Sequence, residues 1–334
     1  MAEYVAGIDI GGTKCSAALG QIQRTAEGGE IRNFHLLGRR SFATAGTPEK
    51  VISLLTACVR ELAEENGLRR EEFLGLGISC GGPLDHRAGL IKSPPNLPGW
   101  DNVPVVRRME EELGIKARLQ NDANACALAE WKFGAGRGCR DMIFLTCGTG
   151  LGAGLILDGR LYSGSGDMAG EAGHIRMSGT GPVGYGKAGS LEGFCSGGGI
   201  AQLARIKVLE RLQMGERPTL CPRPEGLSEL TAREVAEAAG KGDPLALEVM
   251  EISGEYLGRG LAILIDLLNP EAVVLGSIYE RCRHLLEEKV RETVRREALR
   301  TSAERCRILP AALGDRIGDY GAFCVACYGG EDER

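Results

Sequence analysis

The chain has 334 residues, of which 43% are hydrophobic and 25% are charged, and its formal net charge is −5 at pH 7. These values are ordinary for a globular protein and allow two domains with separate cores. The acidic balance argues against nucleic acid as the main partner, and no apolar run reaches the roughly 18 residues that a membrane-spanning helix needs. The twelve cysteines are scattered through predicted strands and helices, which favours reduced thiols in a cytoplasmic protein.

The first candidate site is a turn near the start of the chain. Tyr4–Ile10 predicts a short strand, a second strand begins at Cys15, and the turn between them is formed by Gly11, Gly12, Thr13 and Lys14. A turn between two strands excludes the Walker loop and the dinucleotide-binding fingerprint, which both open a helix. Its N–H groups, hydroxyl and ammonium suit phosphate oxygens, and Asp9 beside it could hold Mg²⁺ directly or through water. The alternative is a tight hairpin that uses glycine only for its positive φ.

Two later loops in the first half carry possible polar contacts. Phe73–Ser79 predicts a strand, and Gly81 lies in the glycine turn that follows it, a common place for ligand contact in α/β folds and also a common way simply to turn. Ser93–Trp100 reads SPPNLPGW, a rigid loop in which Asn96 could offer an amide to a polar ligand. Loops rich in Pro and Gly are structural more often than not, so both alternatives stay open.

The stretch from Arg118 to Gly154 carries the strongest pattern in the chain. A short strand delivers Asn121 and Asp122 to the start of a helix that runs to about Phe133. The next strand, Met142–Thr146, leads into a second glycine-rich turn that contains Gly148, Thr149 and Gly150. One carboxylate at a strand-to-helix junction, followed by a turn whose backbone can approach an anion, predicts a base that faces a phosphate.

The second half adds further polar candidates. Glu171 and His174 lie three residues apart in a glycine-rich loop, where a histidine has little core to pack into. Glu192 is the single acid in the glycine-rich stretch 180–199. Gly276 and Ser277 follow a short buried strand, in a turn where an adenine or a ribose could lie.

Together these segments resemble the ROK family of sugar kinases and their relatives, within the actin-like, ribonuclease-H-like ATPase superfamily. The resemblance covers essentially the whole chain and rests on DIGGTK at Asp9–Lys14, SPPNLPGW at Ser93–Trp100, NDANACALAE at Asn121–Glu130, TCGTGLGAG at Thr146–Gly154 and EAGH at Glu171–His174.

The resemblance implies an α/β fold made of two actin-like, ribonuclease-H-like domains, a bilobed hexokinase-type arrangement with the sugar in the cleft between them. We assign residues 1–120 to the N-terminal domain and residues 121–316 to the C-terminal domain. The C-terminal helix, residues 317–330, is expected to pack back on the N-terminal domain.

The family's functional residues can be carried over to matching positions. The resemblance implies that Asp122 is the catalytic base. Including the two loop candidates above, the expected sugar contacts are Gly81, Asn96, Asn121, Asp122, Glu171, His174 and Glu192. The expected contacts to ATP, with Mg²⁺ at Asp9, are Asp9, Gly11, Gly12, Thr13, Lys14, Gly148, Thr149, Gly150, Gly276 and Ser277.

One segment departs from the family pattern. Most members place three zinc-binding cysteines in a CxCGxxGCxE segment after the histidine. Counting back from Glu192, Val183, Tyr185 and Ser190 stand at those positions. A structural zinc site needs about four nitrogen or sulfur ligands, and only His174 remains, so we predict that zinc is absent.

The implied activity is ATP-dependent phosphorylation of a free hexose, with glucose as the first choice because it is the family's broadest substrate. The alternatives are kinases for N-acetylmannosamine, N-acetylglucosamine, fructose or allose. The family also contains sugar-sensing repressors with an N-terminal helix-turn-helix. Here the first phosphate turn begins at residue 11, which leaves no room for one, so we expect an enzyme with no nucleic-acid or membrane partner. Family members are often dimers or tetramers, so a homo-oligomer is expected.

Overall fold

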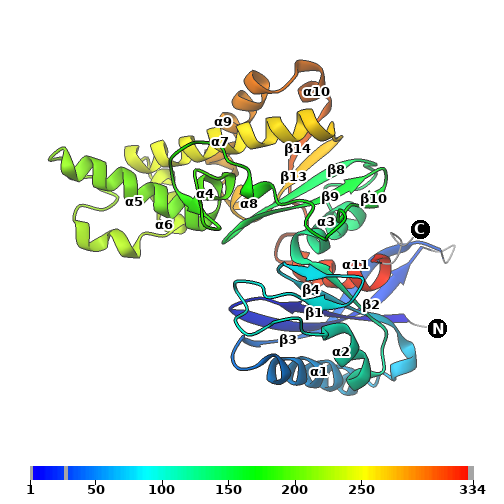
Figure 1. Ribbon diagram of the computed structural model, residues 1–334. Helices are drawn as coiled ribbons and strands as arrows, with labels where there is room; N and C mark the ends of the chain where they lie inside the picture. The colour runs from blue at the N-terminus through cyan, green and yellow to red at the C-terminus, as the bar shows by residue number, and fades with distance from the viewer. Residues whose placement is uncertain (1–2, 26–28, 330–334) are drawn as a thin grey trace. The chain divides into compact units, whose positions relative to one another are not determined.

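The computed structural model describes residues 3–25 and 29–329. Contacts between residues divide the chain into two compact units. The first comprises residues 1–140, 154–169 and 312–334, and the second comprises residues 141–153 and 170–311. Helices accompany two five-stranded sheets that mix parallel and antiparallel pairs (Figure 1), so the predicted α/β class is confirmed.

The first unit is built on a sheet of five strands, which are β1 (Glu3–Ile10), β2 (Lys14–Arg24), β3 (Ile31–Ala43), β4 (Phe73–Cys80) and β7 (Ala117–Asn121). Their spatial order is β3-β2-β1-β4-β7. The pairs β1–β2 and β2–β3 are antiparallel, whereas β1–β4 and β4–β7 are parallel. The parallel strands therefore bring their carboxyl ends to one edge, where Asp9, Gly81 and Asn121 lie.

The remaining elements of this unit are α1 (Pro48–Glu65), β5 (Leu84–Asp85), β6 (Leu90–Ile91), α2 (Val105–Leu113), α3 (Asp122–Phe133), β10 (Arg160–Leu161) and α11 (Ile317–Tyr328). α1 begins with Thr47 as N-cap and Pro48 in the first turn, and buries a stripe that includes Val51, Leu55 and Leu62.

α11 lies directly on the sheet of the first unit because glycines there leave room for it. A Cβ atom added at Gly77 would lie 1.8 Å from the Ala322 carbonyl oxygen, and one at Gly7 would lie 2.9 Å from the Ala322 Cβ. Ala6 and Ile8, on either side of Gly7, belong to the core with α1, as the alternation of side chains along a strand requires. The helix α11 thus forms part of the first unit.

The second unit contains three parallel strands, β8 (Met142–Cys147), β13 (Ala272–Leu275) and β14 (Arg307–Pro310). The whole second sheet has the order β10-β9-β8-β13-β14, where β9 spans Leu151–Leu157. A small hairpin is formed by β11 (Val183–Gly184) and β12 (Lys187–Ala188). The helices are α4 (Leu191–Cys195), α5 (Gly197–Gln213), α6 (Ala232–Gly240), α7 (Pro244–Leu268), α8 (Ile278–Arg281), α9 (Arg283–Glu297) and α10 (Arg300–Arg305).

The compact units differ from the predicted domains, since residues 121–140, 154–169 and 312–316 lie in the first unit. The reason is that α3 packs against α11. The domain boundaries themselves stay a prediction. Within the described residues, no helix is both long and apolar enough to span a membrane.

A buried carboxylate fastens α3 to the segment that leads into α11. Glu130 is 0% exposed and accepts N–H groups from Ala135 at 2.8 Å, Ala312 at 3.0 Å and Leu313 at 2.9 Å. Removing such an acceptor leaves several buried donors without a partner, which is more costly than losing one exposed hydrogen bond.

We predict that Glu130→Ala lowers the free energy of unfolding of the first unit by about 3 kcal/mol. Urea denaturation followed by tryptophan fluorescence measures this unit alone, because both tryptophans, Trp100 and Trp131, lie in it. The control is Glu65→Ala, which removes an exposed ion pair with Arg40 and should change the free energy by less than about 1 kcal/mol. Equal effects of the two variants would contradict the structural role of Glu130.

Candidate functional site

The start of α3 holds the predicted catalytic residue. Asn121 ends β7 and caps the helix, its Oδ1 accepting N–H groups from Ala123 at 3.0 Å and Asn124 at 3.4 Å. Asp122 is the first helical residue and accepts the Ala123 N–H at 2.8 Å. Asp122 keeps an exposed surface, and the surrounding protein raises the pKa of its carboxyl group by displacing water, which the backbone N–H groups partly oppose.

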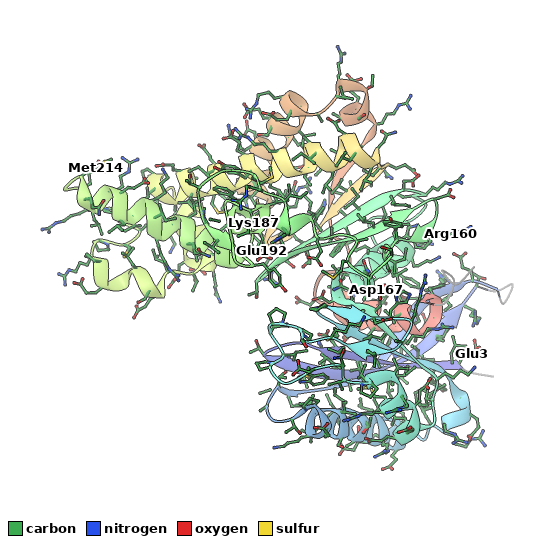
Figure 2. All side chains as sticks on the ribbon, in the orientation of Figure 1. Glu3, Arg160, Asp167, Lys187, Glu192 and Met214 are labelled. Atoms are coloured by element: carbon green, nitrogen blue, oxygen red, sulfur yellow. The ribbon has the colours of Figure 1, made fainter. Side chains whose placement is uncertain are left out.

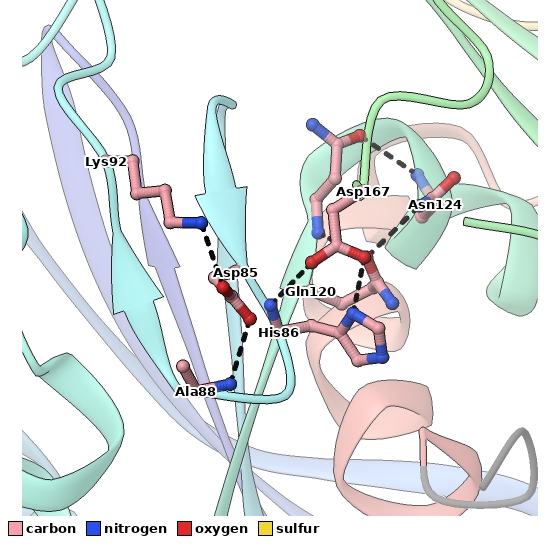
Figure 3. Close-up of polar contacts among 8 residues, drawn as sticks. Asp85, His86, Ala88, Lys92, Gln120, Asn124 and Asp167 are labelled. Atoms are coloured by element: carbon pink, nitrogen blue, oxygen red, sulfur yellow. Dashed lines mark hydrogen bonds and ion pairs between the residues drawn. The ribbon is translucent and has the colours of Figure 1, made fainter. Parts of the chain in front are cut away.

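A buried pair of amides supports this junction from behind, and sequence patterns did not reveal it. Gln120 and Asn124 are each 2% exposed. The Gln120 Oε1 accepts the Asn124 Nδ2–H at 3.1 Å and the Asn121 N–H at 2.8 Å (Figure 3). The NDAN segment is therefore held on both sides of the Asp122 carboxylate, the predicted base.

Three predicted residues of the first unit come together around Asp122. A Cβ atom added at Gly81 would lie 3.5 Å from the Asn96 Nδ2 and 4.0 Å from the Asp122 Oδ2. One added at Gly82 would lie 3.5 Å from the Asn121 Nδ2. Glycine at positions 81 and 82 thus leaves open space beside two amides and one carboxylate.

The first glycine turn is held against the Asn96 loop. Gly11 N–H donates to the Lys14 carbonyl at 3.1 Å, and Thr44, which sequence analysis missed, fixes the turn by donating its N–H to the Thr13 carbonyl and its hydroxyl to the Gly11 carbonyl at 2.6 Å. A Cβ atom at Gly12 would collide with the Asn96 carbonyl oxygen at 2.4 Å. The turn and the loop therefore touch, and Gly12 is required for that contact.

Asp9 lies in an acidic environment at the end of β1. Its pKa is raised to about 6, first by burial and then by the negative charge of Asp122, while a hydrogen bond with Ser79 and the charge of Arg39 lower it. Asp319, a residue that sequence analysis missed, pairs with Arg39 at 3.3 Å, and its own charge also raises the pKa of Asp9. A cation near Asp9 would relieve this repulsion.

Sequence analysis also missed a hydrogen-bonded pair of side chains in the first unit. His86, after β5, donates its backbone N–H to the Asp167 Oδ2 at 2.8 Å, and its Nδ1 lies 2.6 Å from the Asp167 Oδ1 (Figure 3). Both side chains are largely buried, at 13% and 10% exposed. This pair ties the segment after β10 to the β5–β6 hairpin, whose turn is closed by Asp85 through Lys92 and Ala88.

The second unit contains a pocket of about 1140 Å³, large enough for a nucleotide. Of the predicted ATP contacts in this unit, Gly148, Thr149 and Ser277 line it, whereas Gly150 and Gly276 do not. Arg205, Arg233, Arg281 and His284 contribute positive or protonatable groups, Glu237 an acidic one, and Leu230, Ile278 and Met250 apolar surface.

The start of α5 forms another part of this pocket wall. Ser196 caps the helix by accepting the Gly199 N–H at 3.0 Å, and Gly197 and Gly198 line the pocket. Helix N-termini carry partial positive charge and unpaired N–H groups, so this end of α5 suits a phosphate. The run of glycines after Ser196 was the sequence signal for this feature, and sequence analysis gave it no role.

The predicted sugar-binding acid of the second unit is tied to the second glycine turn. The Glu192 Oε2 accepts the Leu151 N–H at 2.9 Å, and a Cβ atom at Gly150 would lie 2.9 Å from the same oxygen. A Cβ atom at Gly173 would lie 3.3 Å from the Glu192 Cβ, so the loop with Glu171 and His174 passes beside Glu192. Figure 2 locates Glu192 on this unit.

Metal binding by protein ligands alone finds little support in the described residues. Within residues 3–25 and 29–329, no group of three or more His, Cys, Asp or Glu side chains could hold a metal ion. The donor set around His174 does not fit the family's zinc, and the absence of zinc stays a prediction. Mg²⁺ held mainly by nucleotide phosphates needs only one or two carboxylates, and Asp9 fits that role.

Comparisons with known proteins agree over almost the full chain. The ROK family profile matches residues 5–327. A glucokinase of Streptomyces coelicolor is 30% identical over 96% of both chains, and a xylose repressor of Caldicellulosiruptor bescii is 31% identical over 83% of this chain and 68% of the repressor. The crystal structure of a ROK family glucokinase from Streptomyces griseus, in complex with glucose and AMPPNP, is 30% identical, covers 97% of this chain and 99% of that one, and has a TM-score of 0.75. The chain belongs to the ROK family.

Proposed function

We propose that the protein phosphorylates glucose with ATP as the phosphoryl donor. The observation that carries this proposal is the group formed by Asp122, Asn96 and Gly81 at the start of α3. This group places a carboxylate beside an amide and open space. The relatives of similar length include a glucokinase.

We propose sugar contacts in each unit separately. In the first unit, Asn96 and Asn121 supply amides and Asp122 a carboxylate. Because the Asn121 Oδ1 already caps α3, its Nδ2 is the group assigned to a sugar hydroxyl. In the second unit, Glu171, His174 and the Glu192 Oε1 are assigned to the remaining hydroxyls. A buried polar group without a partner costs about 1–3 kcal/mol, so such a site can discriminate between epimers.

The nucleotide contacts we propose are the two glycine turns and the pocket of the second unit. Gly11–Lys14 and Gly148–Gly150 are assigned to the phosphates, with the N-terminus of α5 beside the second turn. The arginines of the pocket wall and Ser277 are assigned to the nucleoside. Asp9 would hold Mg²⁺ through water, and this ion would neutralise negative charge on the phosphates.

The protein's main chemical task is then positioning and proton acceptance. Phosphoryl transfer requires the attacking oxygen in line with the leaving oxygen, and little covalent chemistry from the protein. Asp122 accepts the proton of the sugar hydroxyl as that oxygen attacks. Because Asn121 and Gln120 fix the start of α3, the carboxylate is held in place before the sugar arrives.

Several finer points belong to the same proposal. Glucose is chosen over N-acetylmannosamine, N-acetylglucosamine, fructose and allose on the relatives' activity. A sugar-binding regulator is the second candidate, favoured only by relatives such as the xylose repressor. The twelve cysteines are scattered through the strands and helices of a large chain, a pattern typical of reduced thiols, which favours a reducing compartment such as the cytoplasm. A homo-oligomer remains our expectation.

We predict that Asp122→Asn retains glucose binding but lowers kcat by at least about a hundredfold, because the amide cannot accept the proton. Isothermal titration calorimetry measures binding and a coupled ADP-release assay measures turnover. Asp315→Asn, at an exposed position in the first unit, serves as control and should leave both unchanged. Near-normal turnover in the Asp122 variant would remove Asp122 from the role of base.

We predict that kcat/KM falls as the pH is lowered. The midpoint of this fall should lie above about pH 4, which is the ordinary pKa of an aspartate. The protein raises the pKa of Asp122, so its carboxylate takes up a proton earlier as the pH is lowered and stops acting as a base. Samples returned from each pH to pH 7.5 and assayed there control for irreversible loss. A flat kcat/KM down to pH 4.5 would contradict the assignment.

We predict that Gly12→Ala lowers kcat/KM by about tenfold or more, because the added Cβ collides with the Asn96 carbonyl and displaces the sugar loop or the phosphate turn. The matched control is Gly29→Ala, where an added Cβ meets no atom within 4 Å. Steady-state kinetics with both substrates measures the effect. If both variants keep normal kcat/KM, the contact between turn and loop has no part in catalysis.

A further inference from the structure

The segment between His174 and Glu192 is folded tightly although it lacks the ligands for zinc. Backbone hydrogen bonds close it, from Met177 N–H to the Gly189 carbonyl at 2.8 Å and from Leu191 N–H to the Ile175 carbonyl at 2.9 Å. β11 and β12 pair inside it through a turn at Tyr185 and Gly186, both with positive φ, as a tight hairpin requires. Backbone pairing therefore defines the shape of the segment.

Side chains at its two ends fasten this hairpin to helices of the same unit. The Gln202 amide, on α5, accepts the Val183 N–H at 3.1 Å and donates to the Val183 carbonyl at 2.8 Å. Ser190 is 0% exposed, and its hydroxyl accepts the Gly193 N–H at 3.1 Å while lying 3.4 Å from the Gly184 carbonyl. Val183 and Ser190 stand at two of the positions where most family members have cysteines. At these two positions, hydrogen bonds fix the segment where other members have metal ligands.

The hairpin also reaches the sugar-binding histidine. The Lys187 Nζ donates to the His174 backbone carbonyl at 2.7 Å, and the Tyr185 ring lies edge-on to the His174 imidazole, with centroids 6.1 Å apart. On the other side, Gly184 lies against Glu192, where an added Cβ would be 2.7 Å from the Glu192 Cβ. One small hairpin thus contacts both residues. Figure 2 labels Lys187 and Glu192 on this unit.

We propose that Gln202, Ser190 and Lys187 form a metal-independent clamp that positions His174 and Glu192 for the sugar. These three are positioning residues, since they act through the backbone of His174 and through the hairpin against Glu192. This inference rests on the proposed function only in taking His174 and Glu192 as sugar contacts. Lys187 acts on His174 alone, so its loss should affect sugar binding and leave nucleotide binding unchanged.

The test measures the Kd of glucose by calorimetry and the KM of glucose and of ATP by kinetics, for wild type, Lys187→Ala and Gln202→Ala. The expected result is that both variants weaken glucose binding about tenfold, while Lys187→Ala leaves the KM of ATP within about twofold. Lys187→Arg keeps a donor and should restore most of the affinity. Gln213→Ala, at an exposed position on the same helix, is the matched control and should bind glucose normally.

A second arm tests independence from metal. Wild type is dialysed against EDTA, its zinc content is measured, and glucose binding is measured again with Mg²⁺ alone restored. We expect less than about one zinc per ten chains, because the site lacks ligands, and an unchanged Kd. Zinc at one per chain, with binding lost on its removal, would overturn the proposal even if Gln202→Ala failed to fold.

The outcomes separate this inference from the proposed function. If wild type binds glucose without turnover and Lys187→Ala binds it more weakly, the kinase activity fails and the clamp stands. If wild type is an active kinase and both alanine variants bind glucose as wild type does, the clamp is wrong and the activity stands. If wild type does not bind glucose or any other hexose, both are wrong.

Discussion

The capping of α3 by Asn121 is the interaction on which the rest of the site depends. A helix start leaves N–H groups that need an acceptor, and the Asn121 side chain supplies it. This fixes Asp122 in the first turn, at the carboxyl edge of a parallel sheet where the ends of β1 and β4 also lie. The Asp122 carboxylate is therefore held by the backbone at the start of α3, which the Asn121 cap and the Gln120 amide fix.

Close approaches at glycine bring separate segments together within each unit. Gly12 lets the first turn touch the Asn96 loop, Gly77 lets α11 lie on the sheet, and Gly150 leaves room for the Glu192 carboxylate. In each place a methyl group would overlap a neighbouring atom at 2.9 Å or less. Glycine at these three positions therefore permits contact between segments that are far apart in sequence.

The sequence predicted most of what local patterns determine. Strand-turn-strand patterns gave the turns at Gly11–Lys14 and Gly148–Gly150, and motif order gave the family and the α/β class. It did not reveal the pair of His86 with Asp167, because partners that are 81 residues apart leave no periodic signal. It also missed the local pair of Gln120 with Asn124, which spans the junction between β7 and α3. The sequence also did not show how the segment between His174 and Glu192, which lacks the zinc ligands, is held in place. Gln202, which holds it, lies on a separate helix. The site assignments remain proposals that rest on these contacts.

The most direct measurement of the central claim is ADP release by the purified protein with ATP and Mg²⁺, across a panel of hexoses and N-acetylhexosamines. Our account predicts that glucose stimulates ADP release well above the rate without sugar, and that glucose gives the highest kcat/KM of the panel. A higher kcat/KM for another sugar would contradict the choice of substrate. ADP release that no sugar stimulates would contradict the proposal that this protein is a sugar kinase.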